Sequence, residues 1–247
     1  MKVLKLENLS KTFYTEIGEL KVLDNINFDV SAGEIVAILG PSGAGKSTIL
    51  NLISGLLSPS EGKVEVNGEL GYMFQRDQLF DWRTVWNNVI LGLEIKKEKD
   101  PKRKEDVRKM LEKYGLLEFI NNYPYELSGG MRQRIALIRT LSTKPNILLL
   151  DEPFSALDYQ TRIKISDDVY NMIRAENLTG ILVTHDISEA IAMADRVIVL
   201  SKRPATIKRI HHIDIVDQEN EKATPMFKRT NPLFQKYFDE IWRELNE

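Results

Sequence analysis

The chain has 247 residues, of which 43% are hydrophobic and 28% are charged, and its formal net charge is -2. This composition is typical of a globular protein with one large domain, or with a domain that carries an inserted subdomain. The charge gives no electrostatic signature of nucleic-acid binding, and the absence of cysteine excludes disulfides and thiolate metal sites. No apolar run approaches the roughly 20 residues that span a bilayer, and the N-terminus lacks the apolar core of a signal peptide. If the chain acts at a membrane, we expect other subunits to cross it.

The first part of the chain predicts short β-strands and one short helix. Apolar and β-branched runs separated by turns predict strands over 12–14, 22–30, 34–39 and 63–68. The run 34–39 is the most apolar of these, so we expect it to be buried. Residues 48–54 predict a helix that Gly55 ends.

Residues 40–48, between the buried strand and this helix, read GPSGAGKST and match the phosphate-loop pattern G-x-x-x-x-G-K-[ST]. Glycines let successive backbone N–H groups turn toward phosphate oxygens, and the helix directs its positive dipole end at the same anion. Lys46 adds a charge for the β- and γ-phosphates, and the Ser47 hydroxyl suits Mg²⁺. A chance match in a glycine-rich turn is the alternative. We assign the whole loop to nucleotide binding: Gly40, Pro41, Ser42, Gly43, Ala44, Gly45, Lys46, Ser47 and Thr48.

From about residue 77 to 144 the pattern becomes helical. The stretch 94–113 is crowded with charges of both signs and interrupted by Pro101. We interpret it as a solvated helical face with a loop, rather than as a basic nucleic-acid arm.

A second glycine motif lies at 127–134, which reads LSGGMRQR. Ser128 can cap the following helix, whose apolar face consists of Met131, Ile135, Ile138 and Leu141. The helix start formed by Ser128, Gly129 and Gly130 is a second anion site of backbone N–H groups and a hydroxyl. Which phosphate it would bind stays open, and a plain capped helix is the alternative.

Strand patterns return at 146–151, 180–185 and 196–200, with helical stretches between them. This alternation predicts a mainly parallel sheet covered on both faces. Near the C-terminus, Asn231 suits a helix N-cap and Pro232 the first turn. We expect the apolar stripe of this helix to pack on its own domain: Phe234, Phe238, Ile241 and Leu245.

The strand 146–151 ends in Asp151-Glu152-Pro153, and open α/β sheets bind ligands at such strand ends. Asp151 is expected to hold Mg²⁺, directly or through water. Glu152 is expected to polarise the water that attacks the γ-phosphate. A solvated loop start is the weaker alternative, because a carboxylate beside apolar strand residues is costly without a nearby cation.

His185 ends the predicted strand 180–185. A lone histidine is more often a structural hydrogen-bonder, but at this edge its imidazole can donate to a γ-phosphate oxygen. Residues 186–189 predict a capping box that opens a helix. We expect His211 and His212 in a polar tail and assign them no role.

With these motifs together, the chain resembles the ATPase subunit of an ATP-binding cassette (ABC) transporter from its N-terminus to about residue 205. The phosphate loop resembles Walker A, 127–134 the signature motif and 147–153 Walker B. Other residues match the family's motifs in its order: Gln75 the Q-loop glutamine, Ser155 to Asp158 the D-loop, His185 the switch histidine and Phe13 the aromatic under adenine.

The resemblance implies an α/β fold of the P-loop NTPase type, with a mainly parallel sheet flanked by helices. It implies a core over about 1–76 and 145–205, which includes an N-terminal antiparallel β subdomain. A helical subdomain is expected over about 77–144, and a helical tail over about 206–247.

The family also implies a mechanism and partners. Two copies pair head to tail and enclose two ATP molecules with Mg²⁺, so that each Walker A loop faces the partner's Ser128 and the partner's Gly130. Catalysis is assigned to Glu152, His185 and Gln75, the metal to Ser47, Gln75 and Asp151, and a nucleotide contact to Asp158. The Q-loop and helical insertion transmit motion to transmembrane permease subunits at the cytoplasmic face of the membrane. A solute-binding protein takes part indirectly, and nucleic acid is not a partner.

A narrower likeness is to importers of nitrate, sulfonates and taurine, a group that includes carriers of pyrimidine-type vitamin precursors. It depends on the runs 80–85, 123–126, 131–134 and 199–204. Asp81 departs from the proline usual in that group, on the surface where the membrane subunit docks.

Three alternatives remain. The chain could serve an exporter or lipid-transport system. It could be a soluble cassette acting on DNA or ribosomes, which the lack of a basic stripe and of a long coiled coil disfavours. It could also bind nucleotide without hydrolysis, which Glu152 and His185 disfavour.

Overall fold

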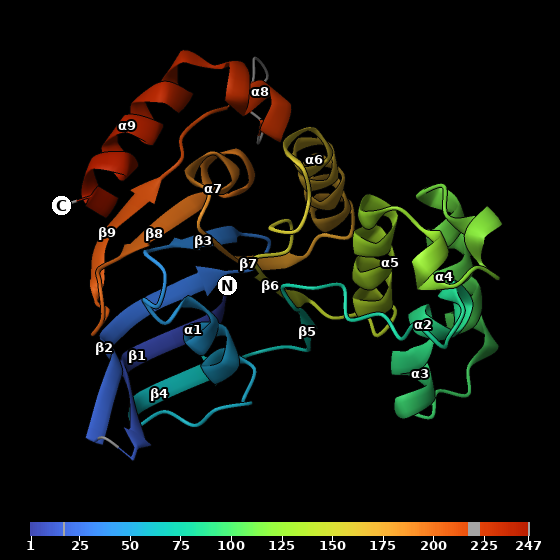
Figure 1. Cartoon of the computed structure of the whole chain (residues 1–247), viewed down its shortest axis with the longest axis horizontal. Helices are drawn as coiled ribbons and strands as arrows, with labels where there is room; N and C mark the ends of the chain where they lie inside the picture. The colour runs from blue at the N-terminus through green and yellow to red at the C-terminus, as the bar shows by residue number, and fades with distance from the viewer. Residues whose placement is uncertain (17, 217–222, 247) are drawn as a thin grey trace.

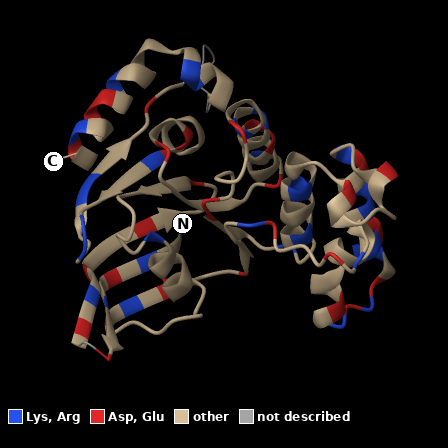
Figure 2. Cartoon of the chain, in the orientation of Figure 1, with Lys and Arg blue, Asp and Glu red and all other residues tan. Residues whose placement is uncertain are grey.

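The computed structural model describes residues 1–16, 18–216 and 223–246, which form two β-sheets, helices around them and a helical part to one side (Figure 1). None of the helices in these ranges combines the length and the apolar character needed to cross a bilayer. Lys and Arg alternate with Asp and Glu over the elements in view, without a stripe of one sign (Figure 2).

The smaller sheet is antiparallel, in the order β2-β1-β4. Its strands are β1 (Lys2–Thr15), β2 (Gly18–Ser31) and β4 (Glu61–Val66). β1 and β2 are 14 residues long each, so the prediction of short strands was wrong. Register shifts interrupt their pairing between Leu6 and Leu9 and again up to Thr12. At such bulges the alternation of apolar and polar residues breaks, which makes one long strand look like several short ones.

The larger sheet has six strands in the order β5-β6-β7-β3-β8-β9. All neighbours are parallel except β8 and β9. This confirms the predicted mainly parallel sheet of a P-loop NTPase. The strands are β3 (Ile35–Leu39), β5 (Leu70–Met73), β6 (Ile147–Asp151), β7 (Thr179–Thr184), β8 (Arg196–Leu200) and β9 (Ile207–His212).

Helices cover both faces of this sheet (Figure 1). On one face lies α1 (Lys46–Ile53), which sits between the two sheets. On the other lie α6 (Tyr159–Ala175) and α7 (Ile187–Met193). The two faces of strand β3 belong to two different apolar cores. Ile35, Ala37 and Leu39 join one core, while Val36 and Ile38 join the other. Side chains alternate across a strand, so a sheet buried on both faces needs apolar residues at every position.

The helical part is the inserted stretch that the sequence predicted. It contains α2 (Val85–Val89), α3 (Leu91–Ile95), α4 (Pro101–Lys113) and α5 (Gly129–Leu141), with short 3-10 turns at Leu117–Phe119 and Pro124–Glu126. Pro101 does not interrupt a helix but begins α4, where its missing N–H costs nothing. The exposed charges of α4 agree with the predicted solvated face.

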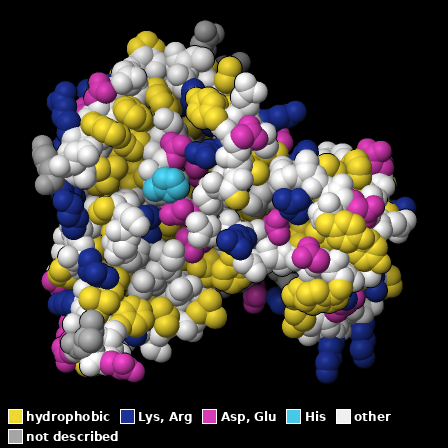
Figure 3. Space-filling model, viewed as in Figure 1, with side chains coloured by type: hydrophobic (Ala, Val, Ile, Leu, Met, Phe, Trp, Pro, Cys, Tyr) yellow, Lys and Arg dark blue, Asp and Glu magenta, His cyan; other side chains and the backbone are white. Residues whose placement is uncertain are grey.

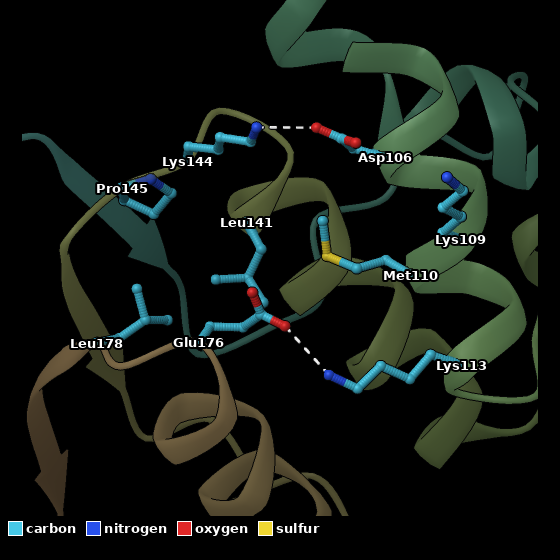
Figure 4. A pocket seen from close by; sticks show the side chains of 9 residues that line it. All are labelled: Asp106, Lys109, Met110, Lys113, Leu141, Lys144, Pro145, Glu176 and Leu178. Atoms are coloured by element: carbon cyan, nitrogen blue, oxygen red, sulfur yellow. Dashed lines mark hydrogen bonds and ion pairs between the residues drawn. The ribbon is translucent and has the colours of Figure 1, made fainter. Parts of the chain in front are cut away.

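A cavity of about 510 Å³ lies between α4, α5 and the turn that joins α6 to β7 (Figure 4). Its floor is apolar, with Leu141 and Leu178 among the lining residues. Two ion pairs join residues that line it: Lys113 of α4 lies 3.2 Å from the Glu176 carboxylate at the end of α6, and Lys144 lies 2.8 Å from Asp106 of α4. At this edge the helical part therefore contacts the sheet region partly through exposed ion pairs, which contribute little to stability.

The C-terminal stretch differs from the predicted helical tail. It begins with β9, which carries His211 and His212 as the edge strand of the main sheet. His211 is buried, and its Nε2 lies 2.9 Å from the Glu244 carboxylate. The expected polar tail was therefore wrong for these residues. Helices α8 (Pro225–Thr230) and α9 (Pro232–Asn246) follow.

The predicted start of α9 is confirmed, because the Asn231 side chain accepts a hydrogen bond from the Leu233 N–H at 2.9 Å. The predicted apolar stripe packs on the core of the same chain, as expected: Phe234, Phe238, Ile241 and Leu245.

Ile241 provides a test of how far this docking stabilises the fold. The side chain is fully buried, so Ile241→Ala should lower the free energy of unfolding by about 2 to 5 kcal/mol, as measured by urea denaturation. Leu233→Ala on the same helix removes a side chain that is 43% exposed and should cost much less. Equal costs for the two variants would mean that α9 does not dock as described.

Candidate functional site

The phosphate-loop residues 40–48 lie at the carboxyl end of β3 and lead directly into α1. Gly43 and Gly45 have φ of 78° and 85°, in the left-handed region that glycine adopts without a Cβ clash. The helix begins at Lys46, two residues earlier than predicted, and no side chain caps its first turn. Its free N–H groups and dipole therefore remain available to an anion.

A cavity of about 490 Å³ opens at this loop. It is lined mostly by polar and small residues: Val22, Ser42, Gly43, Gly45, Lys46, Ser47, Thr48, Gln75, Glu152 and Arg203. Predicted residues from three distant parts of the sequence thus surround one space. Gly40, Pro41 and Ala44 belong to the loop but do not line this cavity.

Lys46 is held against its own loop. Its Nζ donates to the carbonyl oxygens of Gly40 and Pro41, at 2.9 and 3.1 Å. Burial lowers the pKa of this amine, because an ammonium loses hydration there, while the nearby carboxylates of Glu152 and Asp151 oppose the shift. A phosphate in the cavity would supply the counter-charge that this buried ammonium lacks.

Asp151 ends β6 and accepts a hydrogen bond from the Ser47 hydroxyl at 2.9 Å. Burial raises the pKa of the Asp151 carboxyl, as expected for an acid beside apolar strands. The pair provides two hard oxygen ligands next to the phosphate loop, the donor set that Mg²⁺ prefers together with phosphate and water. The residues present therefore fit a magnesium ion.

Glu152 is the centre of a second polar group. Its Oε2 lies 3.1 Å from Nδ1 of His185 and 3.4 Å from Nε2 of Gln75, which donates to it. The structure thus brings together the three predicted catalytic residues. His185 follows β7 directly, one residue beyond the strand end. Glu152 also has a φ of 43°, a left-handed value that is strained for a residue with a side chain and that recurs at active sites.

Five predicted contact residues outside the phosphate loop do not line the cavity: Phe13, Ser128, Gly129, Gly130 and Asp158. Ser128 caps α5, accepting from the Met131 N–H at 3.3 Å, and is exposed together with part of the Ser128–Gly130 helix start. Asp158 caps α6 by accepting from the Thr161 N–H at 3.1 Å. Phe13 is partly buried on β1, with Lys11 Nζ 5.1 Å from its ring centre. None of these side chains lines the cavity of its own chain.

Arg203 and Val22 line the cavity but were not predicted as site residues. Arg203 is an exposed cation that could face a phosphate or a base. The run 199–204 that contains Arg203 supports the importer likeness, but nothing in the local pattern shows that this loop returns to the phosphate loop. The bridge between Leu23 and Ala205 provides that return.

The two loop glycines differ in what surrounds them, which gives a test of the loop geometry. A Cβ at Gly45 would lie 2.7 Å from Val22 Cγ1 and 2.8 Å from Leu23 Cδ2, whereas one at Gly43 would have nothing within 4 Å. Gly43→Ala should cost only the left-handed strain, about 1 to 2 kcal/mol in urea unfolding. Gly45→Ala should cost clearly more. A smaller cost at Gly45 would contradict the packing described.

Comparisons with known proteins identify the family of the chain. The ABC transporter family model matches residues 23–155, which is more than half of the chain. The ABC transporter ATP-binding protein YtlC of Bacillus subtilis is 41% identical over 254 aligned residues, covering 100% of this chain and 96% of YtlC. The nitrate import ATP-binding protein NrtD of a Synechocystis species is 38% identical, covering 96% and 93% of the two chains.

A solved structure extends the likeness to three dimensions. The ATP-binding cassette MJ0796, described as a dimer in a post-hydrolysis state bound to ADP and Pi, superposes with a TM-score of 0.71 at 34% identity. The match covers 85% of this chain and 98% of that one. The phosphate loop, the acidic end of β6 and these matches lead to one conclusion: the chain belongs to the ABC transporter family, in which it is an ATP-binding ATPase subunit.

Proposed function

We propose that the chain hydrolyses MgATP with Glu152 as the general base, in a head-to-tail dimer that drives import of a small solute through separate membrane subunits. The observation that carries this proposal is the contact of Glu152 with both His185 and Gln75 at the mouth of the phosphate-loop cavity.

In the proposed reaction, Glu152 accepts the proton of a water molecule that attacks the γ-phosphorus in line with the departing ADP oxygen. A protonated His185 can donate from both ring nitrogens. It can thus hold the Glu152 carboxylate through Nδ1 and a γ-phosphate oxygen through Nε2. Lys46 and the free N–H groups of α1 stabilise the charge of the β- and γ-phosphates.

The three predicted ligands, Ser47, Asp151 and Gln75, would hold Mg²⁺ through their side-chain oxygens at this cavity. When bound, the ion neutralises charge on the phosphate oxygens. The hydrogen bond from the Ser47 hydroxyl keeps the Asp151 side chain directed toward the phosphate loop.

The helix start at Ser128–Gly130, of which Ser128 is exposed, supports the head-to-tail dimer. It presents a hydroxyl and free backbone N–H groups, yet it does not reach the cavity of its own chain. A second copy in the opposite orientation would bring the partner's Ser128 to the γ-phosphate. Asp158 would contribute at the same interface, and Phe13 would lie under the adenine.

The proposed place of the chain is the cytoplasmic face of the membrane, beneath permease subunits. Relatives named as import ATP-binding proteins for nitrate, taurine and aliphatic sulfonates support the import direction. The proposed solute is one of these or, as the sequence resemblance implies, a vitamin precursor. Hydrophobic side chains gather over the helical part in the view of Figure 3. Trp82, 76% exposed, and Phe74 are large apolar residues near the Q-loop that a permease could cover. A solute-binding protein would act through that permease.

Removing the base while keeping its shape tests the proposed chemistry. Glu152→Gln should reduce ATP turnover at least about a hundredfold, because the amide cannot accept the proton of the attacking water. ATP binding, measured by titration calorimetry, should persist and should favour a dimer in gel filtration. Glu118→Gln, at an exposed glutamate of the helical part, should behave as the unchanged protein. Unchanged turnover in Glu152→Gln would remove Glu152 from the base role.

Lys46→Ala tests the phosphate loop itself. The variant loses the buried ammonium that pairs with the phosphates, so the dissociation constant for MgATP should rise at least about tenfold. Lys104→Ala removes the same charge from an exposed position on α4 and should leave the affinity unchanged. Equal affinities of the two variants in titration calorimetry would contradict the proposed nucleotide site.

A further inference from the structure

Arg203 lines the phosphate-loop cavity, but none of the roles assigned above uses its charge. The side chain is exposed, and within the described part of the chain it forms no hydrogen bond and no ion pair. A guanidinium carries five N–H donors and a permanent positive charge. Arg203 therefore offers unused donors and an uncompensated charge to the space that a nucleotide would fill.

The backbone around Arg203 is fixed, so the side chain extends from a defined position. Arg203 lies in the turn between β8 and β9. The Ser201 N–H donates to the Thr206 carbonyl at 2.9 Å, and the Thr206 N–H donates to the Ser201 hydroxyl at 2.9 Å. The same turn is joined to β2, because the Ala205 N–H donates to the Val22 carbonyl at 2.9 Å. These bonds hold the turn beside the phosphate loop whether or not a ligand is bound.

The contact with β2 indicates which part of a nucleotide Arg203 would meet. Val22 lines the same cavity, and two residues earlier on β2, Leu20 pairs with Phe13, the residue expected under adenine. The proposed base, Glu152, comes instead from the end of β6 in the larger sheet. Arg203 is therefore held by the sheet that carries the expected adenine contact, on the adenosine side of the cavity.

The charges of the lining residues favour an anion at Arg203. Lys46 and Arg203 are the cations of this lining, and Glu152 is its acid. His185 and Gln75 already contact the Glu152 carboxylate, at 3.1 and 3.4 Å. Arg203 thus lacks a free acidic partner among the lining residues. Phosphate matches a guanidinium in both charge and geometry, since two parallel N–H groups can bind two of its oxygens.

We propose that Arg203 binds the α-phosphate of the nucleotide, the phosphate next to the adenosine. This inference rests on the nucleotide site proposed above, in which Lys46 and the N–H groups of α1 serve the β- and γ-phosphates. The charge that develops during γ-phosphoryl transfer lies on the γ-phosphate and the departing ADP oxygen, not on the α-phosphate. The contact therefore stabilises bound ATP and the transition state equally, and acts on affinity rather than on the rate of the chemical step.

Arg203→Ala tests the contact through nucleotides that share the α-phosphate. The dissociation constants for MgATP and MgADP, measured by titration calorimetry, should rise by the same factor, about three- to tenfold. The constant for AMP, measured by competition with MgADP, should rise by a similar factor. In turnover assays KM for ATP should rise while kcat stays nearly unchanged. A loss confined to MgATP, a loss absent from AMP, or no loss at all would overturn the proposal.

Lys202→Ala is the matched control for this variant. It removes a positive charge from the neighbouring residue, which is also exposed but lines a different cavity. Its affinities for the three nucleotides should equal those of the unchanged protein. Equal losses in Lys202→Ala and Arg203→Ala would mean that the turn acts through its general positive field, and would overturn a specific contact.

Two further substitutions separate a phosphate contact from a contact with the ribose or the base. Arg203→Lys keeps the charge and should recover part of the affinity, whereas Arg203→Gln keeps only neutral donors and should bind no better than Arg203→Ala. The ratio of the affinities for MgATP and MgGTP should be the same in all these variants. Full recovery in Arg203→Gln, or a changed ratio, would place the side chain on the ribose or the base and overturn the α-phosphate assignment.

The failure of this inference can be told apart from a failure of the proposed nucleotide site. If Lys46→Ala and Arg203→Ala both bind MgATP as the unchanged protein does, the nucleotide site itself is misplaced. If only Lys46→Ala loses affinity, the role of Arg203 alone fails. Because the Arg203 side chain is exposed, Arg203→Ala should unfold at the same urea concentration as the unchanged protein, so a loss of affinity would not reflect a loss of fold.

Discussion

The site depends on the parallel register of three neighbouring strands. In this register Leu39, the last residue of β3, pairs with Thr184 at the end of β7, and Asp151 at the end of β6 pairs with Val183. The phosphate loop, the two carboxylates and His185 each continue from one of these ends. Parallel strands bring their carboxyl ends to the same edge. Sheet packing thus positions groups that lie more than 100 residues apart in sequence, as the contact between Ser47 and Asp151 shows.

The same strand ends place charged side chains where few water molecules can reach them. Lys46 and Asp151 are both nearly buried, and burial disfavours the charged form of each. The backbone carbonyls bonded to Lys46 and the hydroxyl bonded to Asp151 only partly replace water. A nucleotide with its magnesium ion would balance both charges.

Sequence reasoning located most of this site because its parts are local motifs. The phosphate loop, the acidic strand end and His185 each follow an apolar strand pattern that can be read without the fold. It did not locate Arg203, which only long-range contacts bring to the cavity. It also misread β9, because an edge strand covered by α9 carries polar residues such as His211 that pair with the helix. The pattern at 186–189 likewise does not show which half of the capping box forms: the Asp186 side chain accepts from the Glu189 N–H at 3.1 Å, while the Glu189 side chain is buried.

The central claim is that two copies complete each nucleotide site. Copies with Lys46→Ala are mixed with copies with Ser128→Arg, all in a Glu152→Gln background, and the MgATP retained through gel filtration is counted. In a mixed head-to-tail dimer one site combines the intact Lys46 of one copy with the intact Ser128 of the other. The account predicts that only the mixture retains nucleotide, at about one per mixed dimer. Full retention by the Ser128→Arg copies alone, or none in the mixture, would contradict it.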